Sequence, residues 1–387
     1  MTQAREADRP AREDAQAPAT AISPAAAAEL ERLRAEIDRV DAGVLDLLNE
    51  RARIVCEVGE WKRGTGVSIH SAARERDVIA RLVQRNAGPF PDASIEPVFR
   101  EIISAMRSLE GTLRVAYLGP EGTYSHLAAR SQLGHAAALL PMATIGDVFQ
   151  AVERGRAELG VVPVENTTEG VVTRTLDAFV ESDVTICGEI LQRISHSLLS
   201  RSGRLEDVRR VASIDQPFAQ CRRWLERHLA GVERVETAST AAAAKLAGED
   251  AGVAAIASAL AGEAYGLRTI EAGIEDRRDN TTRFLLIGRA APARSGRDLT
   301  TAVFTVRKAQ AGALHQLLEP FAREGVSLTA IQSRPMPGKP FEYLFFLDME
   351  GHREDPPVAR ALAAAAATAH SHRVLGSFPR AAAEGAP

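Results

Sequence analysis

Hydrophobic residues between positions 24 and 62 recur with the spacing of a helix. They alternate intervals of three and four residues, as the side of a helix that packs against a neighbour requires: Leu30, Leu33, Ile37, Val40, Val44 and Leu47. Ser23 and Pro24 have the residue types of a helix cap and a first helical position. A helix of about 40 residues is ~60 Å long. Two further helical stretches, 71–86 and 94–110, make too small a domain to bury it, so we expect a second chain to cover the apolar stripe.

The hydrophobic pattern changes at Arg114. Short apolar runs bounded by glycine, proline and polar residues alternate with helical stretches up to about Gly288, which predicts an α/β fold. The polar stretch 292–299 is typical of a linker. Beyond it the pattern predicts a ferredoxin-like βαββαβ arrangement. The expected elements are strand 301–306, helix 312–324, strand 326–333, strand 341–349, helix 357–369 and strand 373–378.

Composition and charge exclude several classes of protein. The 387 residues suffice for two or three domains at roughly 100–200 residues each. The formal net charge of −4 gives no basic field for nucleic acid, and no apolar run approaches the ~20 residues of a membrane span. Residues 1–23 lack the apolar core of a secretory signal, so we expect a disordered tail there and a frayed end at 381–387.

The three cysteines, Cys56, Cys187 and Cys221, are far apart and lack the spacing of metal ligands. We expect buried thiols in a reducing cytoplasm, and neither a metal nor a cofactor.

The central part of the chain has three polar clusters at the ends of expected strands. Thr282 and Arg283 stand where a loop enters a strand; a hydroxyl donates a proton and a guanidinium holds a carboxylate. A glycine-rich turn at 119–126 precedes a helix, and residues 162–170 end another strand. A tight turn and a helix cap are equally good explanations for 119–126, and capping suffices for 216–221 and for Ser239-Thr240.

In this order the clusters resemble the motifs of prephenate dehydratases, over residues 113–291. The resemblance implies two α/β lobes, like those of periplasmic solute-binding proteins, and the conversion of prephenate into phenylpyruvate with loss of water and carbon dioxide. It implies that Thr282 protonates the departing hydroxide and that Arg283 holds a carboxylate. Glu165 and Asn166 would orient the ring hydroxyl. The other implied substrate contacts are Thr167 and Asn280.

The helical part has charged residues at informative spacings. Arg51 and Lys62 are eleven residues apart and therefore share a helix face. Arg34 lies seventeen residues before Arg51, about 25 Å along the axis. It cannot serve the same small ligand in the same chain, but it serves a partner's site if two long helices pair antiparallel. An ordinary solvated helix face is the alternative for each of these charges.

Residues 24–112 resemble the all-helical chorismate mutase domain, an intertwined dimer. The family's charged positions are occupied, which implies that the substrate is bound by Arg34, Arg51, Lys62, Arg74 and Glu75. The rearrangement needs no nucleophile, only positioning and cations that stabilise the breaking ether, for which Lys62 is the candidate donor. Glu110 is a second donor only when it is protonated.

Two positions of the mutase part depart from the family pattern. Ser71 stands in a substrate-binding position where the family often has aspartate, and Met106 stands where it often has serine. Both bear on how efficient the mutase is.

Residues 299–380 resemble ACT regulatory domains. Gly312-Ala313-Leu314 and Ser333-Arg334 match the phenylalanine-binding motifs, although a turn and a strand end would explain them in isolation. Gln332 and His315 depart from the usual residues. Feedback inhibition by L-phenylalanine is therefore expected.

The resemblances together predict a multidomain, cytoplasmic, bifunctional chorismate mutase–prephenate dehydratase that is a homodimer or a higher oligomer. Its ligands would be chorismate, prephenate and L-phenylalanine, with no nucleic-acid or membrane partner. One alternative is a dehydratase with an impaired mutase domain. Another is a non-catalytic ligand-sensing protein, against which the Thr282-Arg283 pair and the helical cations argue.

Overall fold

The computed structural model describes residues 23–65, 72–306, 312–336 and 342–381, so the tail predicted at 1–23 and the frayed end at 381–387 lie almost wholly outside the described residues. The chain divides into two units, residues 1–57 and 58–387, which are taken separately here. Among the described helices none is long and apolar enough to cross a membrane.

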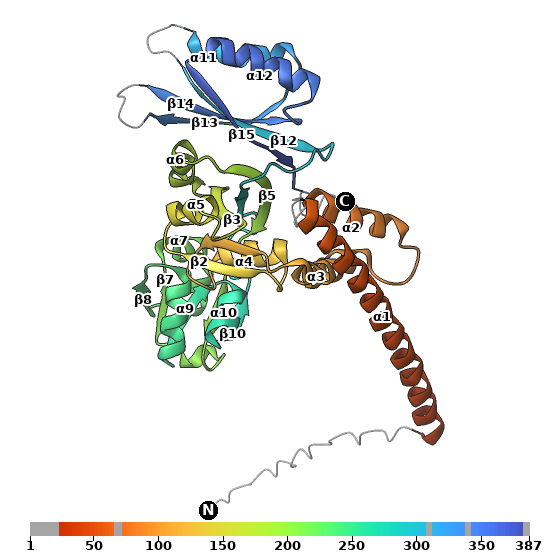
Figure 1. The fold of residues 1–387 in the computed structure, drawn as a ribbon. Coiled ribbons are helices and arrows are strands. Elements are labelled where there is room, and N and C mark those ends of the chain that lie inside the picture. Colours follow the sequence, from red (N-terminus) through yellow and green to blue (C-terminus); the bar gives the residue numbers. More distant parts are fainter. Residues whose placement is uncertain (1–22, 66–71, 307–311, 337–341, 382–387) are drawn as a thin grey trace, which may run out of the picture. The chain divides into compact units, whose positions relative to one another are not determined.

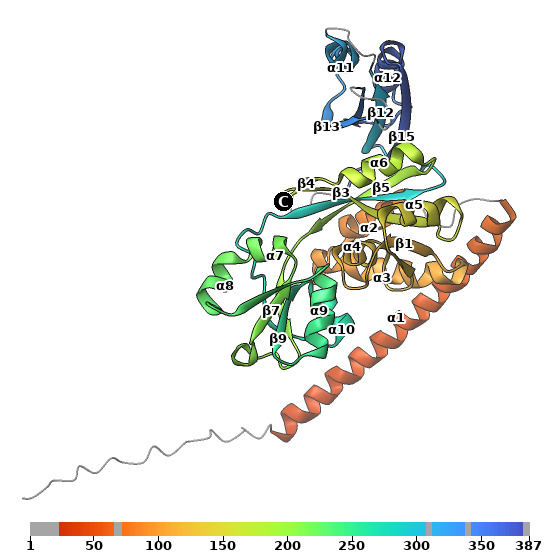
Figure 2. The same cartoon turned by 90° about the vertical axis from the view of Figure 1, so that its left-hand side faces the viewer.

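The first helix is long and continuous. Helix α1 (Pro24–Thr65) has 42 residues and runs without a break (Figure 2). Ser23 Oγ accepts a hydrogen bond from the Ala26 amide at 3.2 Å, which confirms the predicted cap. The predicted apolar stripe is exposed in the single chain, from 40% for Leu30 to 67% for Leu47. Helices α2 (Ala72–Arg85) and α3 (Asp92–Glu110) follow.

Two of the three cysteines are buried, as predicted: Cys187 and Cys221. The prediction is wrong for Cys56, which is exposed because it lies on α1, a helix with much of its surface uncovered in one chain.

The middle of the chain forms two sheets. The first has the order β2-β1-β3-β11-β5, with β4 added to β3. Its strands are β1 (Arg114–Leu118), β2 (Ala138–Met142), β3 (Leu159–Asn166), β4 (Gly170–Val171), β5 (Thr185–Arg193) and β11 (Thr281–Gly288). Its helices are α4 (Tyr124–Leu133), α5 (Ile145–Glu153) and α6 (Thr173–Glu181).

The second sheet has the order β10-β6-β9-β7-β8. Its strands are β6 (Ser197–Ser200), β7 (Arg210–Ser213), β8 (Glu233–Glu236), β9 (Val253–Ala257) and β10 (Arg268–Ala272). A short 3-10 turn (Leu205–Asp207) precedes β7, and the helices are α7 (Asp215–Gln220), α8 (Arg222–His228), α9 (Thr240–Glu249) and α10 (Ala259–Tyr265). Each sheet has its own apolar core, which gives the two α/β lobes that the sequence predicts.

Two chain segments connect the lobes, β5 to β6 and β10 to β11, and they run side by side. The Ile194 amide donates to the Asn280 carbonyl at 2.9 Å, and the Ile274 amide donates to the His196 carbonyl at 3.0 Å. The Glu275 carboxylate accepts from the His196 amide at 2.9 Å. The connection between the lobes is therefore a paired, hydrogen-bonded structure.

The C-terminal part confirms the predicted βαββαβ order. Its elements are β12 (Asp298–Thr305), α11 (Ala313–Arg323), β13 (Leu328–Pro335), β14 (Tyr343–Glu350), α12 (Pro356–Thr368) and β15 (Ser371–Pro379), and the sheet order is β13-β14-β12-β15. Both helices lie on one face of the sheet (Figure 1), over a core that includes Phe304, Phe321 and Leu347. Strand β12 begins three residues earlier than predicted because Asp298 pairs with Pro379.

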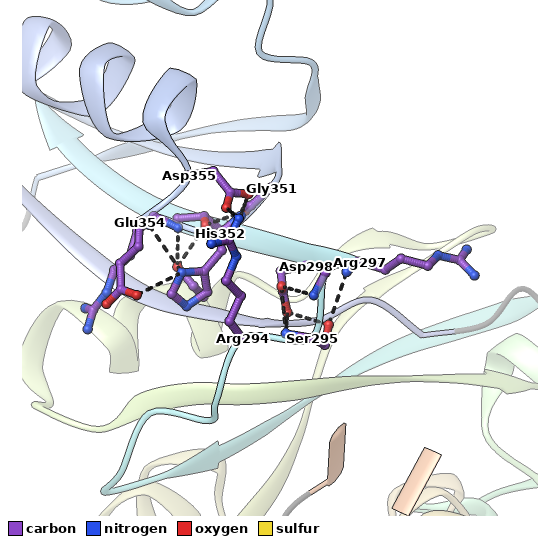
Figure 3. A network of polar contacts seen from close by, with 12 residues as sticks. Arg294, Ser295, Arg297, Asp298, Gly351, His352, Glu354 and Asp355 are labelled. Atoms are coloured by element: carbon purple, nitrogen blue, oxygen red, sulfur yellow. Dashed lines mark hydrogen bonds and ion pairs between the residues drawn. The ribbon is translucent and has the colours of Figure 1, made fainter. Parts of the chain in front are cut away.

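The segment before β12 is held by side-chain contacts (Figure 3). The Asp298 carboxylate accepts from the Ser295 amide at 3.0 Å and from the Ser295 hydroxyl at 2.6 Å. Arg294 forms an ion pair with Asp355, whose carboxylate also accepts from the His352 amide at 2.8 Å. The predicted linker is thus an ordered turn.

Candidate functional site

The end of strand β11 holds Thr282 next to Asn166. The antiparallel register of β3 and β11 places these two residues opposite each other. Asn166 Nδ2 donates to Thr282 Oγ1 and to Asn280 Oδ1, both at 2.8 Å. Thr282 is only 8% exposed.

The orientation of the Asn166 amide is fixed by its other atom. Asn166 Oδ1 accepts from the backbone amides of Thr168 at 2.9 Å and Glu169 at 3.0 Å, so Nδ2 faces Thr282. The Thr282 oxygen therefore accepts a hydrogen bond from Asn166, and its own proton stays available for another acceptor.

Thr167 ties the two strand ends together. Its hydroxyl accepts from the Thr281 amide at 3.0 Å and donates to the Asp279 carbonyl at 3.3 Å. The structure thus brings together four of the residues that the sequence singles out: Asn166, Thr167, Asn280 and Thr282.

Three further residues from both lobes join this cluster and were missed as site residues. Gln220, at the end of α7, accepts from Asn280 Nδ2 at 3.2 Å, and His196 Nε2 lies 2.7 Å from the same Gln220 oxygen. His196 Nδ1 lies 2.8 Å from the Tyr124 hydroxyl. Burial lowers the pKa of His196, although the hydrogen bond to Gln220 opposes this. A neutral His196 that donates through Nε2 extends the hydrogen bonds from Thr282 to the imidazole, and the single proton of the Tyr124 hydroxyl has both His196 Nδ1 and the Ser195 carbonyl at 2.8 Å as acceptors.

Arg283 and Glu165 lie on the opposite face of the sheet from Thr282 and Asn166. Consecutive strand residues point to opposite faces, and Arg283 pairs with Glu165 across the two strands. Arg283 Nε donates to Glu189 Oε2 at 2.8 Å and Nη1 donates to Asp348 Oδ2 at 2.5 Å. The structure does not bring Arg283 together with Thr282; two protein carboxylates bind Nε and Nη1 of its guanidinium, and Nη2 is buried without a partner among the described residues.

The glycine-rich turn before α4 is held by contacts of its own. Thr123 caps the helix, and the Gly122 amide donates to His126 Nδ1 at 3.1 Å. Gly122 has φ +84° and lies against Ala261 of the second lobe, while its carbonyl accepts from Ser258 Oγ at 2.9 Å. These contacts favour the plain turn-and-cap interpretation.

Of the cationic side chains predicted on α1, the structure describes Arg34 and Arg51. Arg34 is exposed and pairs with Glu31 at 2.7 Å. Arg51 is half-buried, and burial lowers the pKa of its guanidinium. The side chain of Lys62 and all of Ser71 lie outside the described residues.

The helices α2 and α3 carry the other predicted mutase residues. Arg74 is exposed, and Glu75 accepts from Arg107 Nη1 at 2.9 Å. Arg107 is only 5% exposed, and the sequence analysis did not identify it. Glu110 packs beside Gly59 of α1, where a Cβ on the glycine would lie 3.2 Å from Glu110 Cγ. Since Lys62 follows Gly59 by three residues, Glu110 lies next to the helix face that carries Lys62.

The predicted effector residues lie at the start of α11 and along β13. Gly312 caps α11 with φ +81°, a conformation that favours glycine, and Ala313 and Leu314 open the helix. Ser333 and Arg334 end β13. Arg334 Nη2 lies 2.7 Å from both carboxylate oxygens of Asp177 in α6.

The fold and the site define a multidomain enzyme of the prephenate dehydratase type, with a helical mutase part and an ACT part. Family models match in the expected order: chorismate mutase type II over residues 33–111, prephenate dehydratase over 115–292, and the ACT domain over 301–367.

The chain is 45% identical to the bifunctional chorismate mutase/prephenate dehydratase of Aquifex aeolicus, over 91% of this chain and 98% of that protein. It belongs to the bifunctional chorismate mutase/prephenate dehydratase family.

Two solved structures resemble this chain over 69% of its length. One is a prephenate dehydratase from Arthrobacter aurescens in complex with L-phenylalanine, at a TM-score of 0.64 and 37% identity, covering 69% of this chain and 90% of that one. The other is a quorum-quenching acylase, at a TM-score of 0.65 and 35% identity, covering 69% of this chain and 98% of that one.

Proposed function

We propose that this chain converts chorismate into prephenate and prephenate into phenylpyruvate, under feedback inhibition by L-phenylalanine. The observation that carries the dehydratase assignment is the Thr282 hydroxyl, whose oxygen accepts from Asn166 at 2.8 Å and whose proton therefore faces away from that partner.

The dehydratase step needs one proton at one place. As the bond between the ring and its carboxylate breaks, carbon dioxide leaves and the electron pair enters the ring. The ring then expels its hydroxyl group, Thr282 supplies the proton, and water is released. Aromatisation drives the reaction. Thr282 regains its proton from solvent or a neighbouring group, since an alcohol is a weak acid by itself.

The surroundings of Thr282 suit an anionic substrate with a hydroxyl group. Asn280 joins Asn166, the hydrogen-bond partner of Thr282, to Gln220, and within the described residues Gln220 Nε2 donates to no protein acceptor. This nitrogen is a candidate donor to a substrate carboxylate or to the ring hydroxyl. The line of hydrogen bonds through His196 holds these amides in one orientation.

The mutase site is completed by a second copy of the chain. The apolar stripe of α1 is exposed in one chain, and burying it against a partner is favourable at roughly 25 cal/mol per Å². In such a dimer Arg34 would serve the partner's site, while Arg51, Lys62, Arg74 and Glu75 would bind chorismate in their own chain. Glu110, beside Gly59, would face the ether oxygen together with Lys62.

L-phenylalanine would bind between two copies of the ACT part, with Gly312 of one chain facing the Ser333-Arg334 strand of the other. The phenylalanine complex of the Arthrobacter aurescens relative supports this ligand class. A biosynthetic enzyme of this kind would act in the cytoplasm.

One incubation tests the proposal against its alternatives. Purified protein is given chorismate, and prephenate and phenylpyruvate are followed. Formation of phenylpyruvate supports the proposal, whereas turnover of added prephenate but not of chorismate would indicate an impaired mutase. No turnover of either would indicate a sensor. A Thr282→Ala variant should lose most dehydratase activity and keep its mutase activity; near-normal dehydratase turnover would refute the role of Thr282.

A further inference from the structure

Strand β11 presents two adjacent side chains to two different surroundings. Thr282 faces Asn166 and the interlobe cluster, and Arg283 faces the sheet of the ACT part. The contacts of Arg283 join the two parts of the chain through four residues, which we call the Arg283 cluster: Arg283, Glu189, Thr301 and Asp348. Glu189 comes from β5 of the first lobe, and Thr301 and Asp348 come from β12 and β14 of the ACT part.

The Arg283 cluster is buried, and its two carboxylates are hydrogen-bonded, whereas Arg283 Nη2 is buried without a hydrogen-bond partner among the described residues. The side chains of Glu189 and Asp348 are 5% and 11% exposed. Thr301 Oγ1 donates to Asp348 Oδ1 at 2.6 Å, so both oxygens of Asp348 are engaged and the carboxylate has one orientation. Glu189 Oε1 also accepts from the Ala381 amide at 2.9 Å. Burial favours the neutral form of Arg283, but the two carboxylates outweigh it and raise the pKa of the guanidinium.

The backbone near Thr282 is irregularly paired on one side, where such an anchor acts. The register between β11 and β3 shifts between Arg283 and Phe284, where the partner of Phe284 is Pro163. Proline has no amide hydrogen to donate, and a bulge interrupts the ladder. Strand β11 is thus irregularly paired with β3 directly after Arg283, while its pairing with β5 continues there, and the side-chain contacts of Arg283 fix this point of the strand further.

The strand that carries the predicted effector residues adjoins the same cluster. Strand β13 pairs with β14, with Ala330 opposite Asp348. Gln332 of β13 lines a cavity of about 30 Å³ together with Arg283 and Asp348. The ACT sheet and the first sheet also share one apolar core, in which Phe346 and Leu375 pack with Leu285. A shift of β13 on effector binding would therefore reach Asp348 through its immediate neighbours.

We propose that Asp348 of the ACT part is a positioning residue for dehydration: by holding Arg283 it fixes the end of β11 and so places the Thr282 hydroxyl. The state of the ACT part thereby sets dehydratase turnover. This inference rests on the proposed dehydratase function, because Thr282 must be the group that is positioned.

The test uses the full-length chain with an Asp348→Asn variant. Asparagine keeps the shape and removes the charge that holds Arg283. A displacement of about 1 Å at a reacting group costs up to ~100-fold in rate, so a partial loosening should lower the dehydratase kcat about tenfold. KM for prephenate should stay within about twofold and mutase activity should be unchanged, because neither the substrate contacts nor the mutase part is altered. L-phenylalanine should lower the residual turnover less than it lowers that of the wild type.

The matched control is Glu350→Gln. Glu350 lies on the same strand, two residues further on, and pairs with Arg380 at 2.6 Å outside the Arg283 cluster. This variant should behave like the wild type. An Asp348→Asn enzyme whose kcat lies within twofold of the wild type would overturn the inference, whereas a wild type without dehydratase activity would overturn the proposed function instead.

A second variant covers the case in which Asp348→Asn fails to fold. Thr301→Val keeps every charge and removes only the hydroxyl that orients Asp348. It should lower kcat about threefold with KM nearly unchanged, and the thermal unfolding temperature should fall by about a few degrees, because one buried hydrogen bond to a carboxylate is lost. An unchanged kcat in a folded Thr301→Val protein would equally overturn the inference.

Discussion

Replacing Asn166 with aspartate should nearly abolish dehydration, because it redirects the Thr282 proton. The new carboxylate oxygen would stand where Nδ2 stands now, 2.8 Å from Thr282 Oγ1 and 2.8 Å from Asn280 Oδ1. A carboxylate only accepts, so the Thr282 hydroxyl would donate to it and not to the departing hydroxide. The bonds from the Thr168 and Glu169 amides would survive, since they need only an acceptor.

The magnitude follows from the loss of one oriented donor at the reacting group. Removing such a donor typically costs about 2.7–4 kcal/mol of transition-state stabilisation, or roughly 10²–10³ in kcat. The assay follows phenylpyruvate from added prephenate, with mutase activity of the same sample as the control for folding. The double variant Asn166→Asp with Thr282→Ala should be no slower than Thr282→Ala alone, because both changes remove the same proton. An Asn166→Asp enzyme within fivefold of the wild type would show that Asn166 does not orient Thr282.

Four further outcomes are expected. Arg34→Ala and Lys62→Ala should each abolish mutase activity, and subunit exchange between them should restore part of it, because one site of the heterodimer then carries neither lesion; no recovery after confirmed exchange would exclude a cross-chain site. Glu110→Gln should lose less mutase activity at alkaline pH than the wild type, since an amide donates at any pH; superimposable profiles would remove Glu110 from the ether oxygen. Gly312→Val should abolish L-phenylalanine binding in calorimetry, because valine is strained at φ +81° and adds bulk; undiminished affinity would place the ligand elsewhere. Burial lowers the pKa of His196, so the unfolded chain binds a proton at this residue more tightly than the folded chain does. The free energy of unfolding should therefore fall as pH drops below about 6.5. In urea titrations at pH 7.5 and 5.5, a His196→Gln variant should show a smaller fall.

The regular elements were predictable because their periodicity is local. The 42-residue α1 and the βαββαβ order follow from the spacing of apolar residues and from turn residues between them. The observed bounds of a strand differ from the predicted ones where pairing with a distant segment extends the strand. Asp298, for example, pairs with Pro379 some eighty residues later. Cys56 was misassigned because it lies on α1, whose surface is largely uncovered in the single chain.

The site was predictable only within a strand end or a loop. Asn166, Thr167, Asn280 and Thr282 stand in short motifs at the ends of β3 and β11, and the sheet brings them together. His196 has no such signal, because its role depends on the meeting of two lobes. Gln220 did have one, a polar side chain at the end of a short helix, but capping explained it equally well.

Consecutive residues of a strand point to opposite faces of the sheet. This local rule alone, applied to the sequence, would have placed Thr282 and Arg283 on opposite faces, and likewise Asn166 and Glu165. Reading each pair as one catalytic unit hid this. Once the pairs are separated, β11 makes different contacts on its two faces: the Thr282 hydroxyl faces the interlobe cluster, and the Arg283 guanidinium faces the ACT sheet. Neighbouring residues of a strand are only about 3.3 Å apart along its axis, so a change at Arg283 would act directly next to Thr282. If Thr282 is the proton donor, the adjacent residues Thr282 and Arg283 would link catalysis to regulation because their side chains point in opposite directions.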